Sequence, residues 1–183
     1  MVRARPDNYA TEPESVITKC VDPGLFTIGH SARTLDEFLE VVHQHDLRTI
    51  LDVRSKPYSR RQPWFNRNAI RDALRRGGCD YFWLGAELGG LAPISIDSPA
   101  FIKRMEQVAE MAKVSRVALM CSEGHPKDCH RGMKLTAYLH RLDGWKDQIA
   151  HITADGSTFD SVWFEDTKPK AWLWVDFPGG EQS

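Results

Sequence analysis

Apolar and polar positions along the chain form a repeating pattern of short apolar runs followed by longer amphipathic stretches. An apolar run of about 4–8 residues that is bounded by polar or glycine residues is too short for a helix and is typical of a buried strand. Such runs predict five strands, at residues 25–28, 49–53, 81–84, 117–120 and 148–153.

The longer stretches carry apolar residues at helical spacing, which predicts a helix after each of the first four strands. Thr34 and Glu37 form a capping box that begins the first helix. Asn66 or Asn68 begins the second, and Ser98 caps the third, which follows a glycine-rich turn at residues 85–91. The fourth helix is indicated by four apolar side chains on one face: Leu135, Tyr138, Leu139 and Leu142.

Strands that alternate with helices at this spacing predict a parallel sheet with right-handed crossovers. The expected fold class is therefore α/β, a three-layer sandwich with a mainly parallel sheet. Two aromatic runs near the end, at residues 162–164 and 172–175, predict a C-terminal flap or hairpin. We expect a flexible N-terminal arm at 1–23, one α/β domain at 24–177 and a flexible tail at 178–183.

Composition agrees with one globular domain, because the 183 residues are 42% hydrophobic. No apolar run approaches the roughly 18 residues of a membrane span, and no apolar N-terminal stretch resembles a signal peptide. We therefore expect a cytoplasmic protein with no membrane partner and with its four cysteines reduced.

Positive charge is concentrated in one part of the chain although the net charge is only -1. Residues 52–76 contain eight basic side chains and two acidic ones. Within this segment aromatic residues lie between arginines, as in a groove that binds phosphate and stacked bases. The expected partner is a phosphate-bearing small molecule or a nucleic acid.

The strongest candidate for a functional site begins where the fourth strand ends, at Cys121, and continues through a polar loop to Cys129 and His130. In parallel sheets, ligands bind beyond the carboxyl ends of the strands. Residues at this edge come from separate loops: His30, Asp52, Arg54, Glu87, Cys121 and Glu123.

These residue types suggest cysteine chemistry. Cys121 is the predicted nucleophile, with a thiol pKa lowered by the following helix start, His130 and Arg131. Glu123 would carry protons, and Cys129 would resolve an oxidised Cys121. His30 would act as an acid or base. The predicted substrate-binding residues are Arg54, Ser55, Tyr58, Arg60 and Arg131.

Metal binding is an alternative use of the same side chains. Cys121, Cys129 and His130 offer sulfur and nitrogen donors that suit zinc or iron, and His125 and His30 could add to them. The spacing differs from that of paired zinc knuckles, so the reading without a metal is preferred.

Several motifs together resemble the prokaryotic domain-of-unknown-function family 488 (DUF488). They lie at residues 27–31, 52–60, 81–90, 120–131 and 151–156. The resemblance covers residues 26–156 and implies a fold and a site, but no reaction. A weaker similarity connects Cys121 and Arg131 with rhodanese and cysteine-phosphatase loops. It departs from them because Arg131 lies ten positions after the thiol, farther than in those loops.

Three hypotheses follow from the sequence. The first is an enzyme, such as a cysteine-dependent hydrolase or transferase, that acts on an anionic, nucleotide-like or nucleic-acid substrate. The second is a non-catalytic nucleic-acid-binding module in which the cysteines and histidines are structural or bind a metal. The third is a thiol redox sensor that uses Cys121 and Cys129.

Overall fold

A computed structural model of the chain describes residue 22 and residues 24–91, 95–142 and 149–160. These residues form one six-stranded sheet with the order β3-β2-β4-β1-β5-β6. The bounds of its strands are β1 Gly24–Gly29, β2 Thr49–Asp52, β3 Asp80–Trp83, β4 Arg116–Cys121, β5 Ile149–Ile152 and β6 Thr158–Asp160. All neighbouring pairs are parallel except β5 and β6, which are antiparallel.

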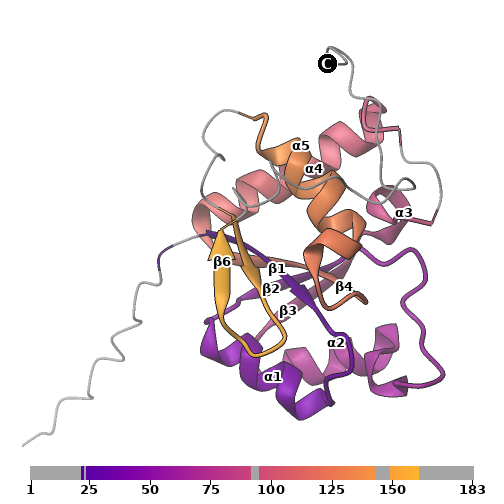
Figure 1. Ribbon diagram of the computed structural model, residues 1–183, viewed down its shortest axis with the longest axis vertical. Coiled ribbons are helices and arrows are strands. Elements are labelled where there is room, and N and C mark those ends of the chain that lie inside the picture. Colours follow the sequence, from indigo (N-terminus) through magenta and orange to yellow (C-terminus); the bar gives the residue numbers. More distant parts are fainter. Residues whose placement is uncertain (1–21, 23, 92–94, 143–148, 161–183) are drawn as a thin grey trace, which may run out of the picture.

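Helices cover both faces of the sheet, so that the molecule has three layers (Figure 1). The helices α1 (Leu35–Gln44) and α2 (Arg67–Arg76) lie on one face. The helices α3 (Gly85–Leu88), α4 (Pro99–Val114) and α5 (Ala137–Leu139) lie on the other. The predicted α/β sandwich with a mainly parallel sheet is confirmed, and its last two described strands form a hairpin.

Two apolar layers hold the helices to the sheet because successive side chains of a strand point to opposite faces. In β1, for example, Leu25 packs in the layer under α4, whereas Phe26 packs in the layer under α1. The first layer includes Phe101, Met105 and Val108 of α4. The second includes Phe38 of α1 and Ile70 of α2.

The helix starts follow the local sequence. Thr34 and Glu37 form the predicted capping box, and the Ser98 side chain accepts a hydrogen bond from Phe101 N at the start of α4. Asn66 precedes α2, but its side chain accepts a hydrogen bond from Ser59 N instead of capping the helix.

The structure differs from the sequence-based elements in two places. Residues 85–91 were expected to form a turn, but Gly85–Leu88 form the short helix α3. Gly85 is required there, because a Cβ atom would lie 2.0 Å from the Arg54 carbonyl oxygen. The segment after Cys129 is not a regular α-helix but begins with the π-helical η3 (Arg131–Thr136) before α5. Leu135 and Leu139 are buried as the apolar spacing predicts.

The predicted C-terminal tail and the aromatic runs at 162–164 and 172–175 lie outside the described residues, as does the predicted N-terminal arm except for Asp22. Among the described residues, none of the helices has the length and apolar character needed to cross a membrane.

Candidate functional site

The carboxyl ends of β1, β2 and β4 lie side by side and bring together residues that are far apart in the sequence. Gly29 is paired with Cys121, and Asp52 with Met120. His30, one residue beyond β1, donates its backbone N–H to the carbonyl oxygen of Cys121 at 3.0 Å. The structure therefore places His30, Arg54 and Cys121 at one edge of the sheet.

Asp52 and Arg54 form a buried ion pair at this edge. The Asp52 carboxylate accepts hydrogen bonds from Arg54 Nε at 2.9 Å and Nη2 at 2.5 Å, and from the Tyr81 hydroxyl at 2.6 Å. Burial opposes the charged form of Arg54, but the hydrogen bonds and charge of Asp52 raise its pKa above the ordinary value. A second acceptor, the Phe65 carbonyl oxygen, lies 2.9 Å from Arg54 Nη2. Arg54 is thus held by protein groups.

His30 is fixed by this ion pair. Its Nδ1 lies 3.2 Å from the Ser31 carbonyl oxygen, which can only accept, so that Nδ1 carries the hydrogen. Its Nε2 then accepts from Arg54 Nη1 at 3.2 Å. The ring stacks on Phe65 with centroids 4.3 Å apart. Burial and then the charge of Arg54 lower the pKa of His30 to about 4. His30 is therefore a neutral side chain with both nitrogens engaged.

A second cluster contains Cys121, Cys129 and His130. The sulfur of Cys121 lies 3.9 Å from His130 Nδ1, and the sulfur of Cys129 lies 3.6 Å from the same nitrogen. All three possible ligand atoms lie within 4.8 Å of one another. The side chains are almost inaccessible, with exposures of 6%, 1% and 6%.

The backbone orients the imidazole of His130 in this cluster. Its Nε2 lies 3.1 Å from the Val53 carbonyl oxygen, so Nε2 carries a hydrogen and Nδ1 faces the two sulfurs. Gly90 packs against the ring so closely that a Cβ atom there would lie 2.6 Å from Nδ1. Val53, which directly follows β2, and Gly90 in the loop after α3 therefore set the position of His130.

The two thiols differ in their surroundings. A hydrogen bond to Cys129, burial and the charge of Cys129 raise the pKa of Cys121 well above its ordinary value. Burial also acts to raise the pKa of Cys129, but hydrogen bonds with Cys121 and His130 and the charge of Arg131 lower it well below the ordinary value. The lower thiol pKa of this pair therefore belongs to Cys129. This reverses the environments expected from the sequence, in which Cys121 was the activated thiol.

Arg131 is fully buried beside this cluster. Its backbone N–H donates to Cys129 Sγ at 3.5 Å, and its guanidinium donates to the carbonyl oxygens of Glu123 at 2.7 Å and Gly124 at 3.0 Å. The described ion pairs include no carboxylate partner for Arg131. Close packing requires Gly29 here, since its Cβ atom would lie 1.8 Å from the Glu123 oxygen. Arg131 therefore orders the loop after β4 and supplies positive charge near Cys129.

Other predicted site residues lie farther out. The side chain of Glu123 is exposed, and its main-chain oxygen is the group that contacts Arg131. Tyr58 is 66% exposed and Arg60 is also exposed, whereas Ser55 accepts a hydrogen bond from Leu91 N at 3.0 Å. The structure does not bring these three predicted ligand-binding residues into the sulfur cluster.

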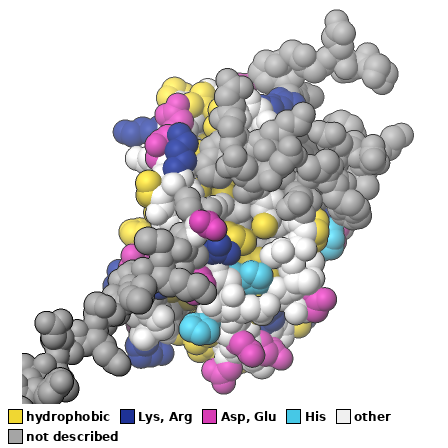
Figure 2. Space-filling view, turned by 90° about the vertical axis from the view of Figure 1, so that its left-hand side faces the viewer, with side chains coloured by type: hydrophobic (Ala, Val, Ile, Leu, Met, Phe, Trp, Pro, Cys, Tyr) yellow, Lys and Arg dark blue, Asp and Glu magenta, His cyan; other side chains and the backbone are white. Residues whose placement is uncertain are grey.

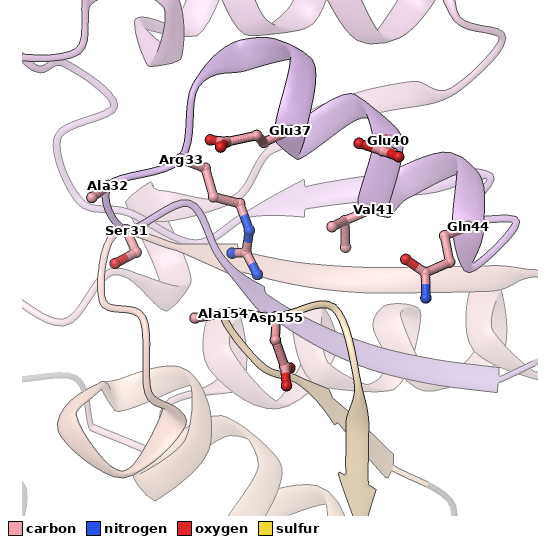
Figure 3. A pocket seen from close by; sticks show the side chains of 9 residues that line it. All are labelled: Ser31, Ala32, Arg33, Glu37, Glu40, Val41, Gln44, Ala154 and Asp155. Atoms are coloured by element: carbon pink, nitrogen blue, oxygen red, sulfur yellow. The ribbon is translucent and has the colours of Figure 1, made fainter.

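Two pockets adjoin the carboxyl edge of the sheet without reaching a sulfur. One, of about 660 Å³, is lined by residues that include Ser55, Lys56, Gly89 and Phe101. The other, of about 440 Å³, lies between α1 and the turn after β5, and Arg33 extends into it (Figure 3).

The smaller pocket is surrounded mainly by negative charge. Its lining contains Glu37, Glu40 and Asp155 but only one basic residue, Arg33. On the face shown in Figure 2, acidic side chains gather at the lower end, where α1 lies in Figure 1. An anionic substrate is therefore a poor match for this pocket.

Sequence reasoning missed three buried polar residues near the site. Arg33 donates to the carbonyl oxygens of Gly29 and Thr153, and thereby connects the loop after β1 with the turn after β5. Tyr81 completes the hydrogen bonds of Asp52. His151 pairs with Thr27 at 2.7 Å inside the sheet. The sequence did contain a signal for the pair of His151 and Thr27, because each is a polar residue inside an otherwise apolar strand.

The cluster offers two kinds of chemistry. Two sulfurs that approach one another can form a disulfide, and two sulfurs with one imidazole nitrogen can bind a metal ion. His30 is neutral and both of its nitrogens are hydrogen-bonded, and Arg54 is paired with Asp52. These two residues therefore stabilise the neighbouring edge of the sheet.

Comparisons with known proteins are consistent with the motifs in the sequence. A family model described as Domain of unknown function DUF488 matches residues 34–99 and 94–139. A search of the curated proteins and a search of the solved structures gave no match. The matched segments contain α1 through α4 together with Cys121, Cys129 and His130. The chain therefore belongs to the DUF488 family.

Proposed function

We propose that the protein is a thiol redox protein whose reactive centre is the pair Cys121 and Cys129. The observation that carries this proposal is that both sulfurs flank the same nitrogen of His130, at 3.9 and 3.6 Å, inside the fold. The two sulfur atoms lie within 4.8 Å of one another, and a disulfide would bring them to about 2.05 Å. A reducing cytoplasm would keep both residues as thiols between oxidation events.

The proposed reaction is a two-electron oxidation by a hydroperoxide. Cys129 is the first sulfur to react, because the backbone N–H of Arg131 donates to it at 3.5 Å and the positive side chain of Arg131 is buried nearby. Its thiolate attacks one peroxide oxygen, the O–O bond breaks, and the other oxygen leaves as an alcohol or water after taking up a proton. The sulfur of Cys121 then attacks the sulfenic acid of Cys129 and forms the disulfide. The displaced hydroxide takes up the thiol proton of Cys121 and leaves as water. Overall, two thiols and one hydroperoxide give a disulfide, an alcohol or water, and a further water.

Burial favours this chemistry over transfer of a large group to a sulfur. Cys121 is 6% exposed and Cys129 is 1% exposed, and neither lines the pockets of about 440 and 660 Å³. A small peroxide fits such a site better than a nucleic acid does. A cysteine-dependent hydrolase or transferase that acts on a nucleotide or nucleic acid would need a much larger substrate to reach the same buried sulfur.

The proposal is tested by counting thiols during oxidation. Reduced protein is treated with hydrogen peroxide, free thiols are alkylated, and the mass of the intact chain is measured over time. Two thiols should be lost together and return on addition of a reductant. In Cys121→Ser or Cys129→Ser the coupled loss should disappear, and it should persist in the control Cys79→Ser, whose thiol is also buried. Independent loss of the two thiols, or loss that a reductant does not reverse, would contradict the proposal.

A second candidate function, binding of a nucleic acid or another phosphate-bearing molecule, is supported by the connection between β2 and α2. Tyr58 and Arg60 are exposed there, and Arg67 lies over the ring of Trp83 at 4.6 Å. Affinity for a short oligonucleotide should fall steeply with salt and drop in Arg60→Ala while surviving Cys121→Ser. Affinity that does not depend on salt would exclude this function.

A further inference from the structure

We infer that Cys121, Cys129 and His130 bind one zinc ion in the reduced protein. The inference rests on the proposed function in one respect, because both cysteines must be present as thiols. It goes beyond the proposed function by assigning a bound ion to this centre. Oxidation to a disulfide would then also remove both sulfur donors of the zinc ion.

The distances fit a tetrahedral ion. Zinc lies about 2.3 Å from sulfur and about 2.0–2.1 Å from imidazole nitrogen, so two such ligands at a tetrahedral angle are separated by about 3.6 Å for sulfur and nitrogen. The observed separations from His130 Nδ1 are 3.6 Å for Cys129 and 3.9 Å for Cys121. The two sulfur–nitrogen separations therefore match those expected around one ion, and all three donor atoms lie within 4.8 Å of one another.

The state of the imidazole also suits a ligand. A histidine that binds a metal through one nitrogen usually donates the other N–H to a carboxylate, a carbonyl oxygen or water. His130 has this arrangement, because Nε2 faces the Val53 carbonyl oxygen at 3.1 Å and Nδ1 faces the sulfurs. The bond is made to the main chain of the residue that directly follows the central strand β2, so the donor is held in place before the metal arrives.

A positive charge lies beside the proposed sulfur ligands. Zinc binds cysteine sulfur as a thiolate, so a nearby cation complements the negative charge of the ligand set. The positive side chain of Arg131 is fully buried near Cys129, and its backbone N–H contacts that sulfur at 3.5 Å. Glu123 is exposed and adds no carboxylate ligand in the described structure. With three protein donors, the fourth position is left for water or a small molecule, as in zinc sites that bind substrate.

The inference is tested on the reduced full-length chain, freed of metal and handled without oxygen. Zn²⁺ is titrated in competition with a coloured chelator, and Co²⁺ binding is followed by absorption. We expect one equivalent of Zn²⁺, and a Co²⁺ complex with thiolate charge-transfer bands. Removing a direct ligand in Cys121→Ser, Cys129→Ser or His130→Ala should weaken binding by at least about 10–100-fold, the usual loss for outer partners of a ligand. Cys79→Ser is the matched control and should bind as the wild type does.

The outcomes separate the metal from the redox chemistry. Circular dichroism shows whether each variant folds. The Co²⁺ spectrum is recorded on the wild-type chain, so it tests the zinc inference even if a variant does not fold. A Co²⁺ complex without thiolate bands, or Zn²⁺ affinity unchanged in the cysteine variants, overturns the zinc inference. If metal-free protein still forms a reversible disulfide, the proposed function stands without zinc. If zinc binds but the disulfide never forms, the redox proposal fails and the metal site stands.

Discussion

Replacing the buried Asp52 by Asn should destabilise the fold far more than a similar change at the surface. Asp52 is 0% exposed and accepts hydrogen bonds from Arg54 and from the Tyr81 hydroxyl. Asn keeps one oxygen but turns an NH₂ group toward donors of these partners, and it leaves the Arg54 charge without a counter-ion. Breaking one partner out of a buried pair costs about 3–5 kcal/mol.

The matched control is Asp72→Asn, which removes the partner of Arg71. That pair has a similar hydrogen bond of 2.9 Å, but its side chains are 36% and 52% exposed. An exposed pair contributes about 0–1 kcal/mol. The free energy of unfolding, measured by urea denaturation at neutral pH, should fall by about 3 kcal/mol or more in the first variant and by less than about 1 kcal/mol in the second. Equal small losses of unfolding free energy in the two variants would refute the argument that the Asp52–Arg54 ion pair stabilises the edge of the sheet where His30 lies.

Three further changes test other parts of the structure. Burial lowers the pKa of His151 from 6.5 to about 3, so between these pH values the unfolded chain binds more protons than the folded chain, and stability falls as the pH decreases. Urea denaturation from pH 6.5 to 4 should show that His151→Asn loses about 1 kcal/mol less stability per pH unit than the wild type does. Parallel curves of stability against pH for the two proteins would contradict this. Gly90→Ala should displace His130 and lower the free energy of unfolding by about 1–3 kcal/mol. In the control Gly77→Ala the added Cβ atom would meet nothing closer than 3.4 Å, so the free energy of unfolding should be nearly unchanged. Equal effects of the two substitutions would contradict the close packing of Gly90 against His130. Thr34→Ala should lower the melting temperature through a loss of about 1 kcal/mol, and no change would mean that the capping box contributes nothing.

The sequence predicts the elements of this fold because their signals are local. Apolar runs mark the parallel strands, and the side chains of Thr34 and Ser98 mark helix starts that the structure confirms. The short helix α3 was missed, since its glycines also fit a turn. Its conformation depends on close packing of Gly85 against the Arg54 carbonyl oxygen, a contact between distant segments.

The sequence indicates which sulfur and imidazole side chains lie near the end of β4, but not how the polar side chains around them are paired. The end of β4 and the start of η3 indicated Cys121, Cys129 and His130 as neighbours, and the structure places them together. Local sequence does not show that Arg54 turns back to Asp52, since that pairing depends on how the chain continues after β2. It also does not show which of two cysteines faces the positive groups.

The most direct test of the redox proposal is a peptide map of the oxidised chain. Trypsin cleaves after Arg116, Lys127 and Arg131, and so places Cys121 and Cys129 on separate peptides, residues 117–127 and 128–131. After limited treatment of the reduced protein with hydrogen peroxide and alkylation of free thiols, mass spectrometry should find these two peptides joined by a disulfide that a reductant removes, with Cys79 alkylated once the chain is denatured. Recovery of the two peptides as separate alkylated or overoxidised species, or joined to other cysteines, would contradict the claim that the two thiols act as one centre.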